Sequence, residues 1–448
     1  MRHLLLLFFA LAVNAAEPVS GLRVGAGRAD ITPEVDVLNW VTGKPYGAVL
    51  DPLFVQAIVL EQGGVKAAIL RWDLVDVSES LRDEVRKAIG AALAIPGENI
   101  LLNASHTHSA PWAPVYTGGH RGKERDTWWA IRHMPAQNEF PPFKRWMARL
   151  LAASVEATKA AIAAAKPVTV AIGRVAVNEY LYNRRPRAPA WGLAETKPAP
   201  ALGYTHPDWN AEVLYGGATF GPMDRTFSVV TFQDAEKKNV ASLYHVALHS
   251  VSIYPSNPGI SADWPGAASR TISSLLGGES LFLQGCAGDI TPWRRGEAAV
   301  ATMAGGLASK AQLAMRYGVT LTAAPLVAGR ATVDLPLTPA GKSRVGADSV
   351  PVEIQVIALG SLAFVAIPGE PLTDIGTAIR ERSPFPQTLV LGYSNGVGVH
   401  YVGMPGEKVR GGYEMGVAGA GTDEAGGLIA DTAVRVLRET YARVRPGQ

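Results

Sequence analysis

The chain has 448 residues, 48% hydrophobic and 18% charged, which excludes a disordered protein and allows a large core. Its 42 basic and 39 acidic residues give a formal net charge of +3, so no nucleic-acid partner is expected. The only cysteine is Cys286, which excludes an intrachain disulfide and leaves the core, helped by any bound metal, to hold the fold.

The N-terminal segment has the pattern of a secretory signal. Arg2 precedes a short apolar run over residues 4–13, and the small residues after it offer a cleavage site. The run is too short to span a membrane. We expect residues 1–15 to be an export signal and residues 16–448 to form one domain that is periplasmic or secreted.

Short β-rich runs alternate with amphipathic stretches along the rest of the chain. Strands are predicted at residues 54–62, 66–72, 99–104, 168–174, 227–233, 240–248, 280–284, 352–359, 362–368 and 388–393. Helices are predicted at residues 78–93, 143–166, 265–276, 298–315, 371–381 and 423–441. Because several strands follow one another directly, we predict an α/β (mixed α+β) catalytic domain whose mixed sheets are flanked by helices. Residues 175–225 are predicted to form long loops over a site.

Three familiar motifs fail on their context. Residues 392–396, GYSNG, have nucleophile-elbow spacing, but no helical pattern follows and only His400 lies downstream. Residues 341–343, GKS, lack the upstream glycine of a phosphate loop. Residues 25–30, GAGRAD, lack the third glycine of a dinucleotide fingerprint. None of the three therefore predicts a function.

Two pairs of histidines lie near strand ends. His106 and His108 follow the strand predicted at 99–104, and residues two apart on an extended chain point to the same side. They suit a metal site, or equally two loop histidines bonded to backbone. In the second pair, His249 lies where an apolar run opens into a polar loop and is favoured as a ligand, whereas His245 is expected in the core.

A carboxylate, Glu370, lies between the strand predicted at 362–368 and the next helix. It suits a metal ligand or a first-turn charge of that helix. Two histidines, a glutamate and one more oxygen ligand make a catalytic zinc site with room for water. Zinc would polarise a carbonyl and lower the pKa of its water to about 7. Iron and manganese also accept such a ligand set.

Seven short motifs occur in one order along nearly the whole chain. They are VGAGRADITP, ASHTHSAP, HS at 249–250, ISADWPG, FLQGCAGDITPW, IPGEPLTDIG and GGYEMGVAGAG. Together they resemble the catalytic domain of the neutral/alkaline, non-lysosomal ceramidase family. The resemblance implies a zinc-dependent amidase that cleaves ceramide to sphingosine and a fatty acid. Its partners would be a ceramide-like lipid and, transiently, a membrane surface.

Carried over position by position, the resemblance implies four zinc ligands, namely His106, His249, Glu370 and Tyr413. His108 matches the second histidine of the HTH motif, which lies beside the metal and handles protons.

Four further positions fall in shared motifs. Arg184 matches an arginine near the substrate end of the pocket, and Asp30 and Asp263 are expected near the site as supporting groups. Thr291 stands where the family's GD-x-S-P segment has serine. It keeps the hydroxyl but adds a methyl group, so a tight pocket would change its substrate preference.

The resemblance leaves alternatives open. Ceramidases of this family continue into an immunoglobulin-like domain, which is expected to be missing here because the chain stops soon after residue 441. A zinc hydrolase of another small amide or ester would show a short polar cleft at Arg184 and Arg185 instead of a long apolar one. A non-catalytic exported binding protein on the same scaffold is the third interpretation.

Overall fold

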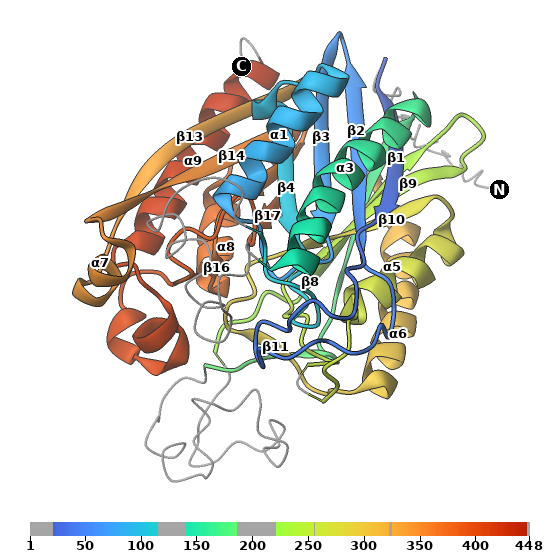
Figure 1. Ribbon diagram of the computed structural model, residues 1–448. Coiled ribbons are helices and arrows are strands. Elements are labelled where there is room, and N and C mark those ends of the chain that lie inside the picture. The colour runs from blue at the N-terminus through green and yellow to red at the C-terminus, as the bar shows by residue number, and fades with distance from the viewer. Residues whose placement is uncertain (1–20, 115–139, 186–220, 255, 322–324, 446–448) are drawn as a thin grey trace, which may run out of the picture.

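The computed structural model describes residues 21–114, 140–185, 221–254, 256–321 and 325–445. Three large mixed sheets with helices packed around them form the molecule (Figure 1). The predicted mixed α/β architecture is confirmed. Among the helices in the described part of the chain, none combines the length and apolar character needed to cross a bilayer.

The first sheet has the strand order β4-β3-β2-β1-β5. Its strands are β1 (Arg23–Asp30), β2 (Phe54–Gln62), β3 (Val65–Trp72), β4 (Ile100–Ala104) and β5 (Lys166–Pro167). β1, β2 and β3 pair antiparallel, whereas β4 runs parallel to β3. The helices α1 (Glu79–Leu93) and α3 (Pro141–Ala163) lie side by side over one face (Figure 1). A short 3-10 helix, η1 (Gly97–Asn99), leads into β4.

The second sheet has the order β10-β9-β8-β6-β12. Its strands are β6 (Thr169–Ala176), β8 (Thr226–Gln233), β9 (Asn239–Val246), β10 (Glu279–Gln284) and β12 (Val319–Thr320). β10 runs parallel to β9, and the other neighbours are antiparallel. The helices α5 (Asp263–Leu276) and α6 (Glu297–Arg316) pack together on this sheet (Figure 1).

The third sheet has the order β13-β14-β15-β17. Its strands are β13 (Leu326–Pro336), β14 (Ser349–Leu359), β15 (Leu362–Ala366) and β17 (Gln387–Leu391). The nearby helices are α7 (Pro339–Val345), α8 (Thr373–Arg382) and α9 (Ala425–Val444). Two short pairs complete the structure, β7 (Leu181–Asn183) with β11 (Ile290–Pro292) and β16 (Glu370–Pro371) with β18 (Tyr401–Val402). The segment after β18 holds the 3-10 helix η4 (Lys408–Arg410) and the π-helix η5 (Tyr413–Ala418).

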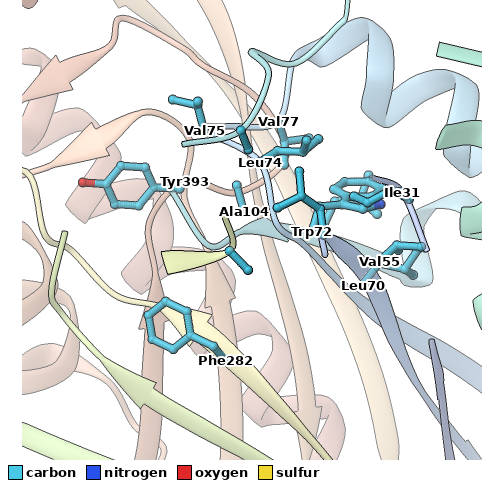
Figure 2. Close-up of a cluster of buried hydrophobic side chains, with 14 of the residues drawn as sticks. Ile31, Val55, Leu70, Trp72, Leu74, Val75, Val77, Ala104, Phe282 and Tyr393 are labelled. Carbon is cyan, nitrogen blue, oxygen red and sulfur yellow. The ribbon is translucent and has the colours of Figure 1, made fainter. Parts of the chain in front are cut away.

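Buried aliphatic and aromatic side chains from all three sheets share one central core. Its members include Ile58, Leu60, Ile69, Val170, Phe232, Leu243, Ile357, Phe364 and Leu389. A second cluster lies between the first two sheets and their helices. Figure 2 shows side chains of β2, β3, β4 and β10 gathered in it, with Tyr393 from the loop after β17 beside them. The strand ends that lead into the site are therefore anchored in packed hydrophobic layers.

The glycines of β1 explain the GAG sequence that resembled a nucleotide motif. A Cβ atom on Gly25 would come within 2.0 Å of the Ala161 carbonyl oxygen of α3. On Gly27 it would come within 2.5 Å of the Ala157 oxygen. The two glycines let α3 lie directly on the strand, a packing role that needs no ligand.

Each large sheet ends in a parallel strand pair joined by a crossover helix, namely β3–α1–β4, β9–α5–β10 and β15–α8–β17. Asn103 links their carboxyl ends. Its Oδ1 accepts the Gln284 N–H at 2.9 Å, and its Nδ2 donates to the Gly392 oxygen at 2.8 Å. In α/β sheets, ligands bind beyond the carboxyl ends of parallel strands, so this junction is where a site is expected.

The six predicted helices are confirmed, with small shifts at their ends. The strands β1 and β13 were not predicted, because the glycines masked the first and the alternating exposure of the second is weakly apolar. The predicted loops at 175–225 contain the short strand β7 at Leu181–Asn183. Residues 186–220 of that region, and the expected export signal at 1–15, lie outside the described residues.

Candidate metal centre

His106 follows β4 at a sharp turn of the chain, where its φ is 62°. Its buried ring places Nδ1 2.6 Å from the carbonyl oxygen of Val75, in the loop after β3. A carbonyl oxygen only accepts hydrogen bonds, so Nδ1 carries the proton. Nε2 is then left with a lone pair that points into the junction.

His249 follows β9 and is held in the same way. Its Nδ1 lies 2.6 Å from the Ala287 oxygen and 3.1 Å from the Ile290 oxygen. Burial, reinforced by the charges of Arg184 and His106, lowers the pKa of the His249 imidazole to about 3. The ring is therefore neutral near pH 7, and its Nε2 also presents a lone pair.

The Glu370 carboxylate from β16 meets both imidazoles. Its Oε2 lies 3.2 Å from the His106 Nε2 and 3.4 Å from the His249 Nε2. The two imidazole nitrogens and the carboxylate oxygen therefore face one another in a buried site, and each of them presents a lone pair. Such an arrangement is stable when a cation lies among the donors.

The spacing of these atoms fits a small divalent ion. A tetrahedral ion with bonds of about 2.0–2.1 Å separates its ligand atoms by roughly 3.3 Å. The ring nitrogens of His106, His108 and His249 all lie within 4.8 Å of one another, a cluster that could hold a metal ion. The His108 Nε2 is 3.1 Å from the His106 Nε2.

A tyrosine hydroxyl also reaches the cluster. The hydroxyl of Tyr401 in β18 lies 3.4 Å from the His249 Nε2. Tyr413, in η5, is half-buried and packs its ring against Tyr401 with the centroids 5.7 Å apart. The structure therefore brings Tyr401 to the imidazoles and places Tyr413 beside it.

Two arginines lie next to this tyrosine in a buried ionic network. Arg184 donates from Nη2 to the Tyr401 hydroxyl at 3.0 Å and from Nε to the Glu414 carboxylate at 2.7 Å. Arg185 binds Glu414 at 3.0 Å and Glu407 at 3.2 Å. Both guanidinium groups already have carboxylate partners, so neither presents an unpaired positive charge to an anionic substrate.

His108 lies in an aromatic wall of the site. Its ring centroid is 5.4 Å from that of Trp40 and 5.6 Å from that of Tyr254. Burial, reinforced by His106 and His249, lowers the pKa of His108 well below its usual range. At neutral pH this imidazole is therefore uncharged.

His400 follows β17 on a strained backbone with φ 66°. Its Nδ1 lies 3.6 Å from the Glu370 Oε1, and its ring stacks on Trp112 with the centroids 5.7 Å apart. Tyr393, also at positive φ, lays its ring 4.1 Å from that of His106. The loop after β17 thus packs against the same cluster.

The remaining predicted residues lie at different depths. Thr291 in β11 is fully buried, and its hydroxyl makes no hydrogen bond within the described residues. Asp263 accepts the Ile253 N–H at 2.7 Å and so fixes the loop after His249, and burial raises its pKa to about 6. Asp30 is exposed and accepts the N–H of the nearby Thr32. His245 points away from the cluster, its Nε2 3.1 Å from the Val390 oxygen.

No protein-family model matches the chain. Two solved structures share its fold. The neutral ceramidase from Pseudomonas aeruginosa superposes with a TM-score of 0.70 and 18% identity, covering 94% of this chain and 75% of that one. This chain has the neutral ceramidase fold. A ceramidase complexed with C2 gives a TM-score of 0.68 with the same identity and coverage.

Within this ceramidase fold, sequence reasoning missed Tyr401, His400 and Glu414. Tyr401 and His400 lie after the strand predicted at 388–393, in a stretch that has neither helical nor alternating periodicity. A signal was present, because residues that follow a buried strand reach the same sheet edge as Glu370. Glu414 gave no signal, since its partner Arg184 is 230 positions away.

Proposed function

We propose that the protein is a zinc-dependent amidohydrolase that cleaves the amide bond of ceramide or a related N-acyl lipid, releasing a sphingoid base and a fatty acid. The observation that carries this proposal is the convergence of lone pairs from His106, His249 and Glu370 in a ceramidase fold. The shared motifs point to the same chemistry. Export through residues 1–15, to the periplasm or beyond, belongs to the proposal.

Four residues would hold the ion, namely His106, His249, Glu370 and a tyrosine. The resemblance gives the tyrosine position to Tyr413, and Tyr401, whose hydroxyl lies 3.4 Å from the His249 Nε2, is the second candidate. A zinc ion bound there supplies a Lewis acid for the amide carbonyl and a water of lowered pKa. Arg184 orients the Tyr401 hydroxyl toward the cluster and favours negative charge on its oxygen.

His108 is the proton carrier of the proposed reaction. Its imidazole is neutral at pH 7, and its Nε2 lies 3.1 Å from the Nε2 of His106, a candidate metal ligand. A water bound to the metal would therefore lie within reach of His108, which can take its proton. The same ring can return that proton to the leaving nitrogen. Trp40 and Tyr254 pack against the ring and hold it in place.

The surroundings favour an uncharged amide over an anionic small molecule. Arg184 and Arg185 are neutralised by Glu414 and Glu407, whereas Trp40 and other aromatic rings line the metal side. An apolar acyl or sphingoid chain suits such a wall better than a carboxylate does.

The test is hydrolysis of a ceramide with a fluorescent acyl chain by purified protein loaded with one equivalent of zinc. We expect release of the labelled fatty acid, its loss on chelation and its return with added zinc. The variant Asp30→Asn, altered at an exposed position, serves as the control and should keep full activity. Hydrolysis of shorter amides or esters alone would support the second interpretation, and hydrolysis of neither would support a binding protein.

A further inference from the structure

His400 is a buried histidine that takes no part in the proposed reaction, although it lies against a candidate zinc ligand. Only 4% of the residue's surface is exposed, and its Nδ1 lies 3.6 Å from the Glu370 Oε1. The other carboxylate oxygen, Oε2, lies 3.2 Å from the His106 Nε2 and 3.4 Å from the His249 Nε2. The two oxygens of Glu370 are therefore divided between the imidazole cluster and His400.

The backbone brings His400 and Glu370 together. The Glu370 N–H donates to the His400 carbonyl oxygen at 2.8 Å, at the point where β16 and β18 pair. Gly369, with φ 74°, allows this approach, because a Cβ atom there would come within 2.4 Å of the same oxygen. His400 itself has φ 66°, a conformation that costs free energy in any residue other than glycine. The fold thus holds this imidazole beside Glu370 in spite of the strain.

Aromatic packing restricts the ring of His400 as well. Trp112, from the loop after His108, stacks on it with the centroids 5.7 Å apart and the planes 25° apart. The stacking limits tilting of the ring and keeps its edge beside the carboxylate. A carboxylate only accepts hydrogen bonds, so the proton in this contact belongs to Nδ1. The separation of 3.6 Å is slightly longer than a hydrogen bond, and contacts of this kind in active sites often shorten in the working complex.

We propose that His400 is a positioning residue, whose Nδ1–H holds the Glu370 Oε1 so that the carboxylate offers only Oε2 to the metal. This inference rests on the proposed function, of which it uses the metal centre but not the substrate. A carboxylate that binds through both oxygens takes two coordination positions, whereas one that binds through a single oxygen takes one. His400 thus keeps open the position that a catalytic zinc site reserves for water.

The test loads the purified protein with Co²⁺, whose visible absorption weakens as its coordination number rises. Two substitutions suit the positive φ of position 400. His400→Gly removes the side chain, whereas His400→Asn keeps an N–H donor at about the distance of Nδ1 from the backbone. We expect His400→Gly to absorb more weakly per bound ion and to lose zinc affinity about 10–100-fold in competition with a chelator. His400→Asn should keep the wild-type spectrum and stay within a few-fold of the wild-type affinity.

The control is His245→Asn, at a buried histidine whose Nε2 lies 3.1 Å from the Val390 oxygen, and it should keep both the spectrum and the affinity. If His400→Gly fails to fold, His400→Asp takes its place, because aspartate has the shape of asparagine without the donor. None of these measurements needs hydrolysis. If the protein cleaves no amide but shows this pattern, the proposed reaction is wrong and the role of His400 stands.

Four results would overturn the inference. A wild-type spectrum and affinity in His400→Gly would show that the side chain only packs on Trp112. Equal losses in His400→Gly and His400→Asn would show that the ring matters and its donor does not. Two ions per wild-type chain, one of them lost in His400→Gly, would make His400 a metal ligand. A protein that binds neither Co²⁺ nor zinc would remove the metal centre together with this role.

Discussion

His106 and His249 are held by backbone carbonyl oxygens, whereas Tyr401 is held by the Arg184 side chain, and Arg184 by the Glu414 carboxylate and the Gly288 carbonyl oxygen. The first pair follows strands β4 and β9, so the sheets fix both rings. The second pair lies on short segments, and Arg184, which binds Tyr401, is paired with Glu414, 230 positions away in the sequence. The imidazole half of the centre is thus built by the sheets, and the phenol half is held by ion pairs.

This difference predicts how substitutions in each half of the centre would act. A ring held by a carbonyl keeps its tautomer whenever the backbone is folded, so its loss removes a ligand without disturbing the sheet. A ring held through buried charges depends on each charge keeping its partner. Substitutions in the two halves should therefore separate metal binding from stability.

The largest effect is expected when an imidazole is removed. His106→Gln and His249→Gln should each lose more activity than the roughly 10–100-fold that loss of an outer partner costs, because each removes a direct donor. His245→Gln, a buried histidine outside the cluster, is the matched control. Activity on the fluorescent ceramide at saturating zinc checks this, and near-wild-type rates in either variant would exclude that residue from the ligand set.

The next prediction compares the two tyrosines. Tyr401→Phe should weaken zinc affinity or rate about 10–100-fold, since its hydroxyl lies 3.4 Å from His249. Tyr413→Phe, which keeps the ring packed on Tyr401, should have the smaller effect. Competition with a zinc chelator gives both affinities. The reverse order would make Tyr413 the oxygen ligand.

Substitutions in the ion-pair half should lower the stability of the fold more than they lower zinc binding. Glu414→Gln leaves Arg184 and Arg185 buried with less counter-charge, which we expect to lower the free energy of unfolding by about 3 kcal/mol. The exposed pair of Glu439 and Arg435 offers a control, because Glu439→Gln should change stability little. Chemical denaturation measures both. Equal effects would mean that the buried network contributes no more than a surface pair.

The last prediction concerns pH in the metal-free protein. The pKa of His249 is about 3 when folded and about 6.5 when unfolded, so the unfolded chain binds more protons between these values. The free energy of unfolding should therefore fall as pH drops from 6.5, by up to about 1.4 kcal/mol per unit from this group. Asp263 and Asp289, with pKa values raised to about 6, act in the opposite direction.

Comparison with a variant isolates the His249 contribution. His249→Gln keeps both aspartates, so its unfolding free energy should depend less steeply on lowering pH than that of the wild type. Denaturation between pH 6.5 and 4.5 in the presence of chelator measures the two slopes. Parallel curves would show that His249 is not buried neutral.

The fold was largely predictable because its helices and inner strands have clear periodicity. His106, His249 and Glu370 could also be identified, since each lies just after an apolar strand whose end is visible in the sequence. The oxygen ligand could not be chosen from spacing alone, because two tyrosines, Tyr401 and Tyr413, follow the last strand. The pairing of Arg184 with Glu414 depends on tertiary structure alone.

The most direct test of the account is zinc titration of the metal-free protein, combined with X-ray absorption at the zinc edge. The account predicts one tightly bound ion per chain with two imidazole nitrogens and oxygen ligands, and loss of that ion in the double variant of His106 and His249. A protein that binds no zinc, or one whose zinc is unaffected by the double variant, would contradict the metal centre.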